Sequence, residues 1–186
     1  MGAREEDMKK EMIKLSGILC AITLVASLLL AGVNKLTLPR IAQAEVLAAE
    51  SAMKEILPEA DEFEEIAENV FKAKKGTETA GYCVTVTTSG FAGQIKMLVG
   101  IGTDYKVKGI EILSHSETAG LGAKAADSKF KGCFKEKNPY ITVVKGETQS
   151  PDEVQAITGA TVTSRAVAIG VSEAFNLLQK VRGGDK

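Results

Sequence analysis

The sequence has few of the residues that build metal centres. It contains three cysteines, Cys20, Cys83 and Cys133, and a single histidine, His115. The cysteines lack metal-ligand spacing, so neither an iron–sulfur nor a zinc site is expected. No Gly-x-Gly-x-x-Gly motif follows a strand pattern and no P-loop occurs, which argues against nucleotide binding by those routes. The net charge of −1 argues against a nucleic-acid partner.

The cysteines leave two arrangements open for the part of the chain beyond the N-terminal region. A Cys83–Cys133 disulfide is compatible with an extracytoplasmic domain, but two small buried thiols are the more common arrangement. Cys20 lies in an apolar run and has no partner nearby in the sequence.

The N-terminal region contains a candidate membrane span. Residues 15–33 run for 19 residues without a charge between Lys14 and Lys35. As a helix, this length crosses a hydrocarbon core of about 30 Å. A signal peptide usually has an apolar region of about 7–15 residues and a small-x-small cleavage site. The longer run, with no convincing site after it, predicts an uncleaved transmembrane helix over residues 15–33.

The charges on either side of the span predict its orientation. Residues 1–14 contain four Lys or Arg, whereas the 20 residues after the span contain two. The excess before the span favours a cytoplasmic N-terminal segment, residues 1–14, although acidic residues there cancel its net charge. The remaining chain is then extracytoplasmic.

Residues 34–76 are expected to form a helical connector. Pro39 predicts a junction between the membrane helix and an amphipathic helix over residues 41–57. Between Glu45 and Glu68 there are nine acids and one base, Lys54. Such a run is most often a solvated helix face, and a docking surface for another protein is the alternative.

Residues 77–182 have the pattern of an α+β domain. Alternating residues predict strands over 80–88, 94–101 and 107–113, and the short connections between them predict an antiparallel meander. A short helix over 124–131, strands over 140–145 and 154–157, and a helix over 164–180 follow, with a tail at 183–186. An antiparallel-rich sheet flanked by helices is therefore expected after one transmembrane helix.

Two small-residue segments are candidates for a binding site. Residues 152–164 pass from a short strand through a turn of small residues into a helix that begins near Ser164, so a hydroxyl placed at that helix start lies beside free N–H groups that favour a phosphate. A plain helix N-cap is the alternative. Residues 115–122 contain two glycines, which permit close approach to a flat ring system. His115 at their start is, taken alone, more often a surface or capping residue.

Both segments resemble motifs of one family. Thr158-Gly159-Ala160-Thr161 resembles the S/T-G-A-T flavinylation motif of the FMN-binding subunits of respiratory sodium pumps and Rnf complexes. Residues 115–122 resemble the H-x-E-T-P-G-L-G motif of that family, with Ala119 in place of proline. With the N-terminal span, the chain is similar to G subunits of Rnf-type ion-translocating complexes, which are related to the C subunit of the sodium-pumping NADH:quinone reductase.

The resemblance implies an FMN-binding domain at residues 77–182. It implies FMN attached covalently to Thr161 through a phosphoester bond and no catalytic or metal-binding residue. The other cofactor-binding residues that it implies, or that we expect from their positions, are Thr158, Gly159, Ala160, Ser164, Glu117, Thr118, Gly120, Leu121, Gly122 and Lys145.

The implied function is that of an electron carrier. The family couples ferredoxin:NAD⁺ electron transfer to movement of Na⁺ or H⁺, so the chain would be one subunit of a translocase and incomplete as an enzyme alone. The implied partners are the other Rnf subunits, the membrane of a bacterial or archaeal cell, crossed once, and a flavin transferase. A membrane-anchored flavin reductase and a cofactor-free binding module are the alternatives.

Overall fold

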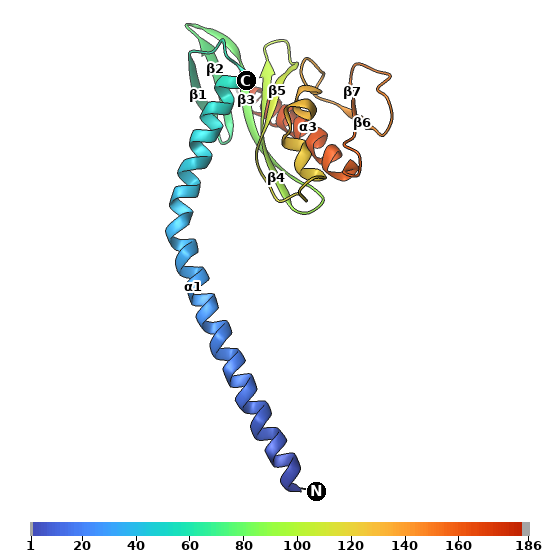
Figure 1. Ribbon diagram of the computed structural model, residues 1–186. Helices are drawn as coiled ribbons and strands as arrows, with labels where there is room; N and C mark the ends of the chain where they lie inside the picture. Colours follow the sequence, from blue (N-terminus) through green and yellow to red (C-terminus); the bar gives the residue numbers. More distant parts are fainter. Residues whose placement is uncertain (1, 184–186) are drawn as a thin grey trace. The chain divides into compact units, whose positions relative to one another are not determined.

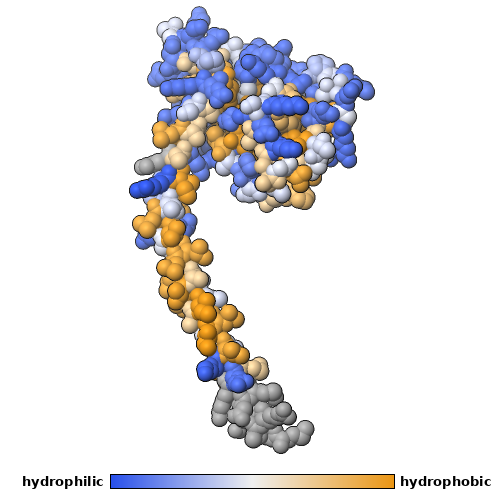
Figure 2. Space-filling model, viewed as in Figure 1, coloured by the Kyte–Doolittle hydropathy of each residue, from blue (hydrophilic) through white to orange (hydrophobic). Residues whose placement is uncertain are grey.

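A 55-residue helix, α1 (Gly2–Ile56), begins the computed structural model, which describes residues 2–183. The chain divides into two units, residues 1–46 and residues 47–186. In the first unit, the predicted span at residues 15–33 lies on α1, and its large apolar side chains are exposed along the helix (Figure 2). This part of α1 is long and apolar enough to cross a membrane.

Pro39 does not end the first helix. The expectation of a junction there, followed by a separate amphipathic helix, was wrong, because α1 continues through Pro39 to Ile56. A proline in a helix interior removes one backbone hydrogen bond. The leucines and alanines on either side of Pro39 are strong helix formers, which favours continuation of the helix.

Five strands of the second unit form one antiparallel sheet in the order β1-β2-β3-β4-β5 (Figure 1). The strands are β1 (Glu62–Ala67), β2 (Val70–Lys75), β3 (Glu78–Ser89), β4 (Gln94–Gly102) and β5 (Val107–His115). Consecutive strands are neighbours throughout, so the predicted meander of β3, β4 and β5 is confirmed.

The predicted helical connector over residues 34–76 is helical only as far as Ile56. Its second part forms the β1–β2 hairpin, in which Glu62 pairs with Lys74 and Glu64 with Lys72. Lys74 Nζ also lies 2.6 Å from Glu64 Oε2. Opposite charges across two strands stabilise the hairpin. The acidic run suggested a helix because its basic partners follow only on the next strand.

The sheet is covered on both faces. On one face, Val84, Val99 and Val167 belong to the main core, formed by β2 to β5 and the last helix. On the other face, Met53 and Leu57 pack in a smaller cluster around Leu98. The alternation of β3 follows the prediction, since Tyr82, Val84 and Val86 contact the main core, while Cys83 belongs to the smaller cluster.

The elements after the large sheet are shorter, except for the last helix. They are the 3-10 helix η1 (Gly122–Ala126), α2 (Ser128–Gly132), β6 (Thr142–Val144), β7 (Glu153–Gln155) and α3 (Thr161–Gly183). β6 and β7 pair in parallel as a separate sheet. The expected single helix over 124–131 is divided between η1 and α2. Gly183 of the predicted tail ends α3, and residues 184–186 lie outside the described residues.

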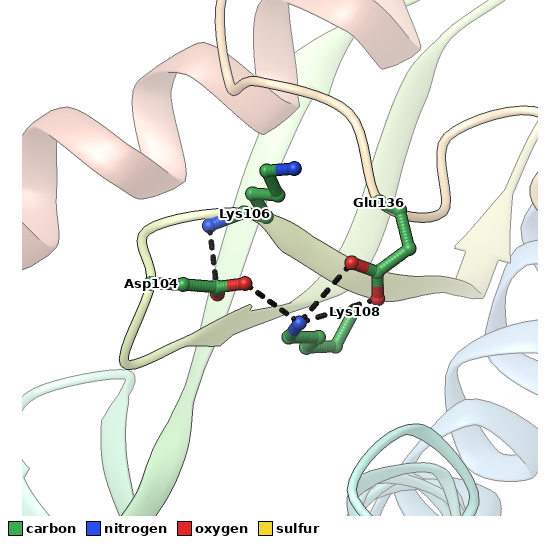
Figure 3. Close-up of polar contacts among 4 residues, drawn as sticks. All are labelled: Asp104, Lys106, Lys108 and Glu136. Atoms are coloured by element: carbon green, nitrogen blue, oxygen red, sulfur yellow. Dashed lines mark hydrogen bonds and ion pairs between the residues drawn. The ribbon is translucent and has the colours of Figure 1, made fainter.

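Lys108 fixes the beginning of β5. Its Nζ lies 2.9 Å from Asp104 Oδ2 and 3.2 Å from both carboxylate oxygens of Glu136 (Figure 3). The backbone N–H of Lys106 donates to Asp104 Oδ1 at 3.2 Å. These contacts join the β4–β5 turn to the segment after α2. The opposite end of β5 leads into the loop at residues 115–122.

The cysteines of the second unit have different environments. Cys83 is fully buried in β3, whereas Cys133 is exposed directly after α2, and both are free thiols. The expectation of buried thiols is therefore confirmed for Cys83 and wrong for Cys133. Residue 133 follows the last position of a five-residue helix, and its Sγ donates to Lys129 O at 3.2 Å.

Candidate functional site

Thr161 is the first residue of α3 and follows a tight turn. The N–H of Ala160 donates to Ile157 O at 2.9 Å, and Gly159 between them has a φ of 79°. A positive φ at the third residue of a turn favours glycine. The turn places Thr161 at the N-terminal end of the helix, where N–H groups lack partners within the helix. Such free N–H groups are what a phosphate site requires.

Ser164 holds this turn against the first turn of α3. Its Oγ accepts a hydrogen bond from Ile157 N and donates one to Ala160 O, both at 2.9 Å. Because the side chain is fully buried and both contacts are internal, Ser164 stabilises the turn. It does not reach the cavity described below.

The loop at residues 115–122 is fixed to its surroundings by Glu117. Its Oε1 accepts hydrogen bonds from the backbone N–H of Phe91 at 2.7 Å and of Ala92 at 3.1 Å. Its Oε2 accepts a hydrogen bond of 2.6 Å from Thr163 Oγ1. The carboxylate therefore joins the β3–β4 turn, its own loop and α3.

Glu117 is buried, with only 8% of its surface exposed. Burial by itself raises the pKa of a carboxyl group. Here the hydrogen bonds from Thr163, Ala92 and Phe91, with a smaller contribution from His115, outweigh burial and hold the pKa of Glu117 below its ordinary value. Glu117 is therefore negatively charged at neutral pH.

These three segments enclose a cavity of about 290 Å³. Its lining residues are Phe91, Glu117, Thr118, Leu121, Gly122, Gly159, Ala160, Thr161, Val162 and Thr163. The structure thus brings both candidate segments to one place, together with the β3–β4 turn. The cavity is close to the lower end of the ~300–1,000 Å³ range of small-molecule sites.

The cavity has an exposed apolar rim and a mainly apolar wall, to which Glu117 and three threonines add polar groups. Phe91, Leu121 and Val162 are 74%, 45% and 51% exposed, although they are large apolar side chains. Thr161 lies among them at the positive end of α3. An aromatic or other flat apolar group fits against such a rim, and an anionic group fits at the helix end.

Gly122 allows the loop to approach α3 closely. A Cβ at this position would overlap Glu117 Oε2 and lie 2.9 Å from Thr163 Oγ1. Any larger residue would therefore displace the carboxylate from its donors. Gly120, two residues earlier, lies in the exposed part of the loop with a φ of 76°.

Four of the predicted cofactor-binding residues, Thr158, Ser164, Gly120 and Lys145, do not line this cavity, and His115, which was not among them, does not line it either. Thr158 lines a different cavity of about 280 Å³, together with Lys124 and Lys129 among others. Lys145 is exposed just after β6 and does not line the cavity at Thr161. His115 is exposed, and its Nδ1 accepts a hydrogen bond from Glu117 N at 3.3 Å.

Three residues that line the cavity, Phe91, Val162 and Thr163, were not predicted from the sequence. Phe91 is an apolar aromatic within a turn of small residues, which is an available signal for an exposed functional side chain. Thr163 follows the recognised motif by two positions, but its contact with Glu117 spans 46 positions of the chain. No local pattern reveals such a pair. Among the described residues, no group of His, Cys, Asp or Glu is arranged to hold a metal ion.

Comparison with protein families matches two parts of the chain. Residues 8–56 match the RnfG N-terminal region, and residues 90–176 match the FMN-binding domain. The second match contains all ten residues that line the cavity at Thr161.

Solved structures share the fold. The C subunit of the Na(+)-translocating NADH-quinone reductase from Parabacteroides distasonis has a TM-score of 0.53 at 24% identity, and the alignment covers 60% of this chain and 61% of that one. NqrC from Shewanella oneidensis has a TM-score of 0.51 at 23% identity, covering 57% and 54%.

Curated relatives extend over nearly the whole chain. The G subunit of the proton-translocating ferredoxin:NAD(+) oxidoreductase complex of Clostridium ljungdahlii is 37% identical, with 86% of this chain and 88% of that protein covered. The G subunit of the Na(+)-translocating ferredoxin:NAD(+) oxidoreductase complex of Acetobacterium woodii is 36% identical, with 92% and 94% covered. The chain belongs to the family of G subunits of ion-translocating oxidoreductase complexes.

Proposed function

We propose that this chain is an electron-carrier subunit of a membrane complex that couples ferredoxin:NAD⁺ electron transfer to the movement of Na⁺ or H⁺, and that it carries FMN covalently on Thr161. The observation that carries the proposal is the position of Thr161. It lies at the N-terminus of α3 and on the wall of a cavity with an apolar rim. Relatives named as G subunits of such complexes support the assignment to a complex.

The residues around the cavity fit FMN. Phe91 and Leu121 offer apolar surface for the isoalloxazine ring, and the first N–H groups of α3 offer hydrogen bonds to the phosphate. The charge of Glu117 opposes a second negative charge nearby, and the N–H groups at the start of α3 offset this repulsion for a phosphate on Thr161.

Attachment requires an activated donor, because a threonine hydroxyl is a weak nucleophile unaided. Thr161 Oγ1 would form a bond to the FMN-side phosphorus of FAD on a flavin transferase. The bond between the two phosphates breaks, AMP leaves, and the hydroxyl proton passes to a base of the transferase. Thr161 is partly exposed, so a second protein has access to it.

Bound FMN supplies the capacity to accept and donate electrons. The chain's own residues attach it, orient it and set the charge around it. A tethered cofactor cannot diffuse, so electrons arrive from and leave to cofactors on neighbouring subunits. The span at residues 15–33 anchors the domain in the membrane of a bacterial or archaeal cell, with the domain on the extracytoplasmic side.

The test is the mass of the full chain purified after coexpression with a flavin transferase. We expect a gain equal to FMN less one water, and a fluorescent tryptic peptide spanning residues 146–165. Gentle detergent purification should retain other membrane subunits. A chain without covalent flavin would contradict the proposal, and efficient NADH oxidation by the isolated flavinylated chain would favour a stand-alone reductase.

A further inference from the structure

Glu117 is buried at the meeting point of the three segments that enclose the cavity. The β3–β4 turn contributes two backbone donors, at Phe91 and Ala92, and α3 contributes the hydroxyl of Thr163. Each carboxylate oxygen thus has a donor from another part of the chain. The side chain fixes the distance between the aromatic rim at Phe91 and the start of α3.

The same contacts keep a negative charge in the cavity wall. Apart from His115, which is exposed, the groups that act on Glu117 are neutral donors. Its charge is therefore stabilised by hydrogen bonds but not cancelled by a salt bridge, and no ion pair of Glu117 occurs among the described residues. A fixed negative charge opposes the arrival of another negative charge nearby, and burial reduces screening by solvent.

We propose that Glu117 is a positioning residue whose carboxylate, held by Thr163 and by the backbone of Phe91 and Ala92, fixes the cavity walls and lowers the reduction potential of the flavin. This inference rests on the proposed attachment at Thr161. Glu117 acts on the flavin through its charge and through the walls that it joins, with its own hydrogen-bonding capacity directed to the protein.

The decisive comparison is between two variants of the full flavinylated chain. Glu117→Gln keeps the size of the side chain and removes its charge, so the midpoint potential should move upward. Glu173→Gln removes the same charge from an exposed site on α3, 12 residues after Thr161 and therefore about 18 Å along the helix. Its potential should equal that of the wild type.

Glu117→Asp distinguishes the effect of the carboxylate charge from the effect of where the carboxylate lies. It keeps the charge but is one methylene shorter, so it should leave the potential near the wild-type value while the circular dichroism of the flavin changes. An unchanged potential in Glu117→Gln, or an equal upward shift in Glu117→Asp, would overturn the inference. Covalent flavin in the wild type, measured by mass, is the separate test of attachment.

Thr163→Val provides a second route if Glu117→Gln does not fold. Valine has the shape of threonine without the hydroxyl, so only one donor to the carboxylate is removed. The circular dichroism of the flavin should change as α3 loses its contact with the loop. An unchanged spectrum and potential in Thr163→Val would also overturn the inference.

Discussion

Thr163 Oγ1 donates a 2.6 Å hydrogen bond to Glu117 Oε2 across 46 positions of sequence. Both side chains are buried, and both line the cavity at Thr161. The bond connects the loop after β5 to the first turn of α3. Through it, the two segments that resemble family motifs become one site.

Thr161→Ala should abolish covalent flavin completely, because it removes the hydroxyl oxygen that forms the phosphoester. Thr161→Ser should retain it. Thr158→Ala is the matched control, since Thr158 lines a different cavity and we expect attachment to survive its loss. Flavin fluorescence on a denaturing gel, followed by mass analysis of the tryptic peptide, measures the result. Acid-stable flavin on Thr161→Ala would show that the attachment residue is another one.

Gly122→Ala should destabilise the fold by about 1–3 kcal/mol, because the new Cβ overlaps the Glu117 carboxylate and displaces it from its donors. Gly132→Ala is the control, since a Cβ there has no neighbour within 4 Å. That variant should remain within about 1 kcal/mol of the wild type. Urea unfolding of the full chain in detergent measures both. Equal stability of the two variants would contradict the close approach at Gly122.

The stabilising effect of Glu117 should depend on pH. Its pKa in the folded chain is lower than in the unfolded chain, where it is about 4.3. The carboxylate therefore stabilises the fold fully above the unfolded pKa, and this contribution is lost as the pH falls through the folded pKa. The difference in free energy of unfolding between the wild type and Glu117→Gln should be largest near pH 7 and should shrink below pH ~4. A constant difference would show that the charge is not what stabilises the contact.

Cys83 should resist thiol reagents in the folded chain. Burial raises its pKa to about 12, so at pH 8 the reactive thiolate is only about one part in 10⁴. Cys133 is exposed, so the reagent has access to it and should modify it. In a Cys20→Ser background, iodoacetamide labelling and mass analysis should find one modified residue, Cys133. Modification of neither residue would point to a disulfide between them.

The orientation of the domain can be tested through the same thiol. If the domain is extracytoplasmic, a membrane-impermeant maleimide added to intact spheroplasts should label Cys133 in the Cys20→Ser background. Inverted vesicles should protect it. Labelling only in inverted vesicles would reverse the proposed topology, which rests on the Lys and Arg excess before residue 15.

The features that could be predicted are those encoded by neighbouring residues. The uncharged run at residues 15–33, the alternation of Tyr82, Val84 and Val86, and the turn before Thr161 each depend on a few consecutive positions. The fold and the family that these patterns predicted are confirmed by the structure and by the comparisons with known proteins. The β1–β2 hairpin was not predicted because the lysines that pair with Glu62 and Glu64 lie on the following strand.

The amino-acid sequence by itself determined the membrane-length helix, the meander and the small-residue turn at Thr158–Thr161, since periodicity and turn chemistry act over short distances. Tertiary structure alone decided how the two motif segments meet and which further residues complete the site. It brought Phe91 and Thr163 to Glu117 and left Lys145 and Ser164 outside the cavity. The physical reason is that a buried carboxylate needs donors from whichever segments folding places beside it, and these segments are distant in sequence.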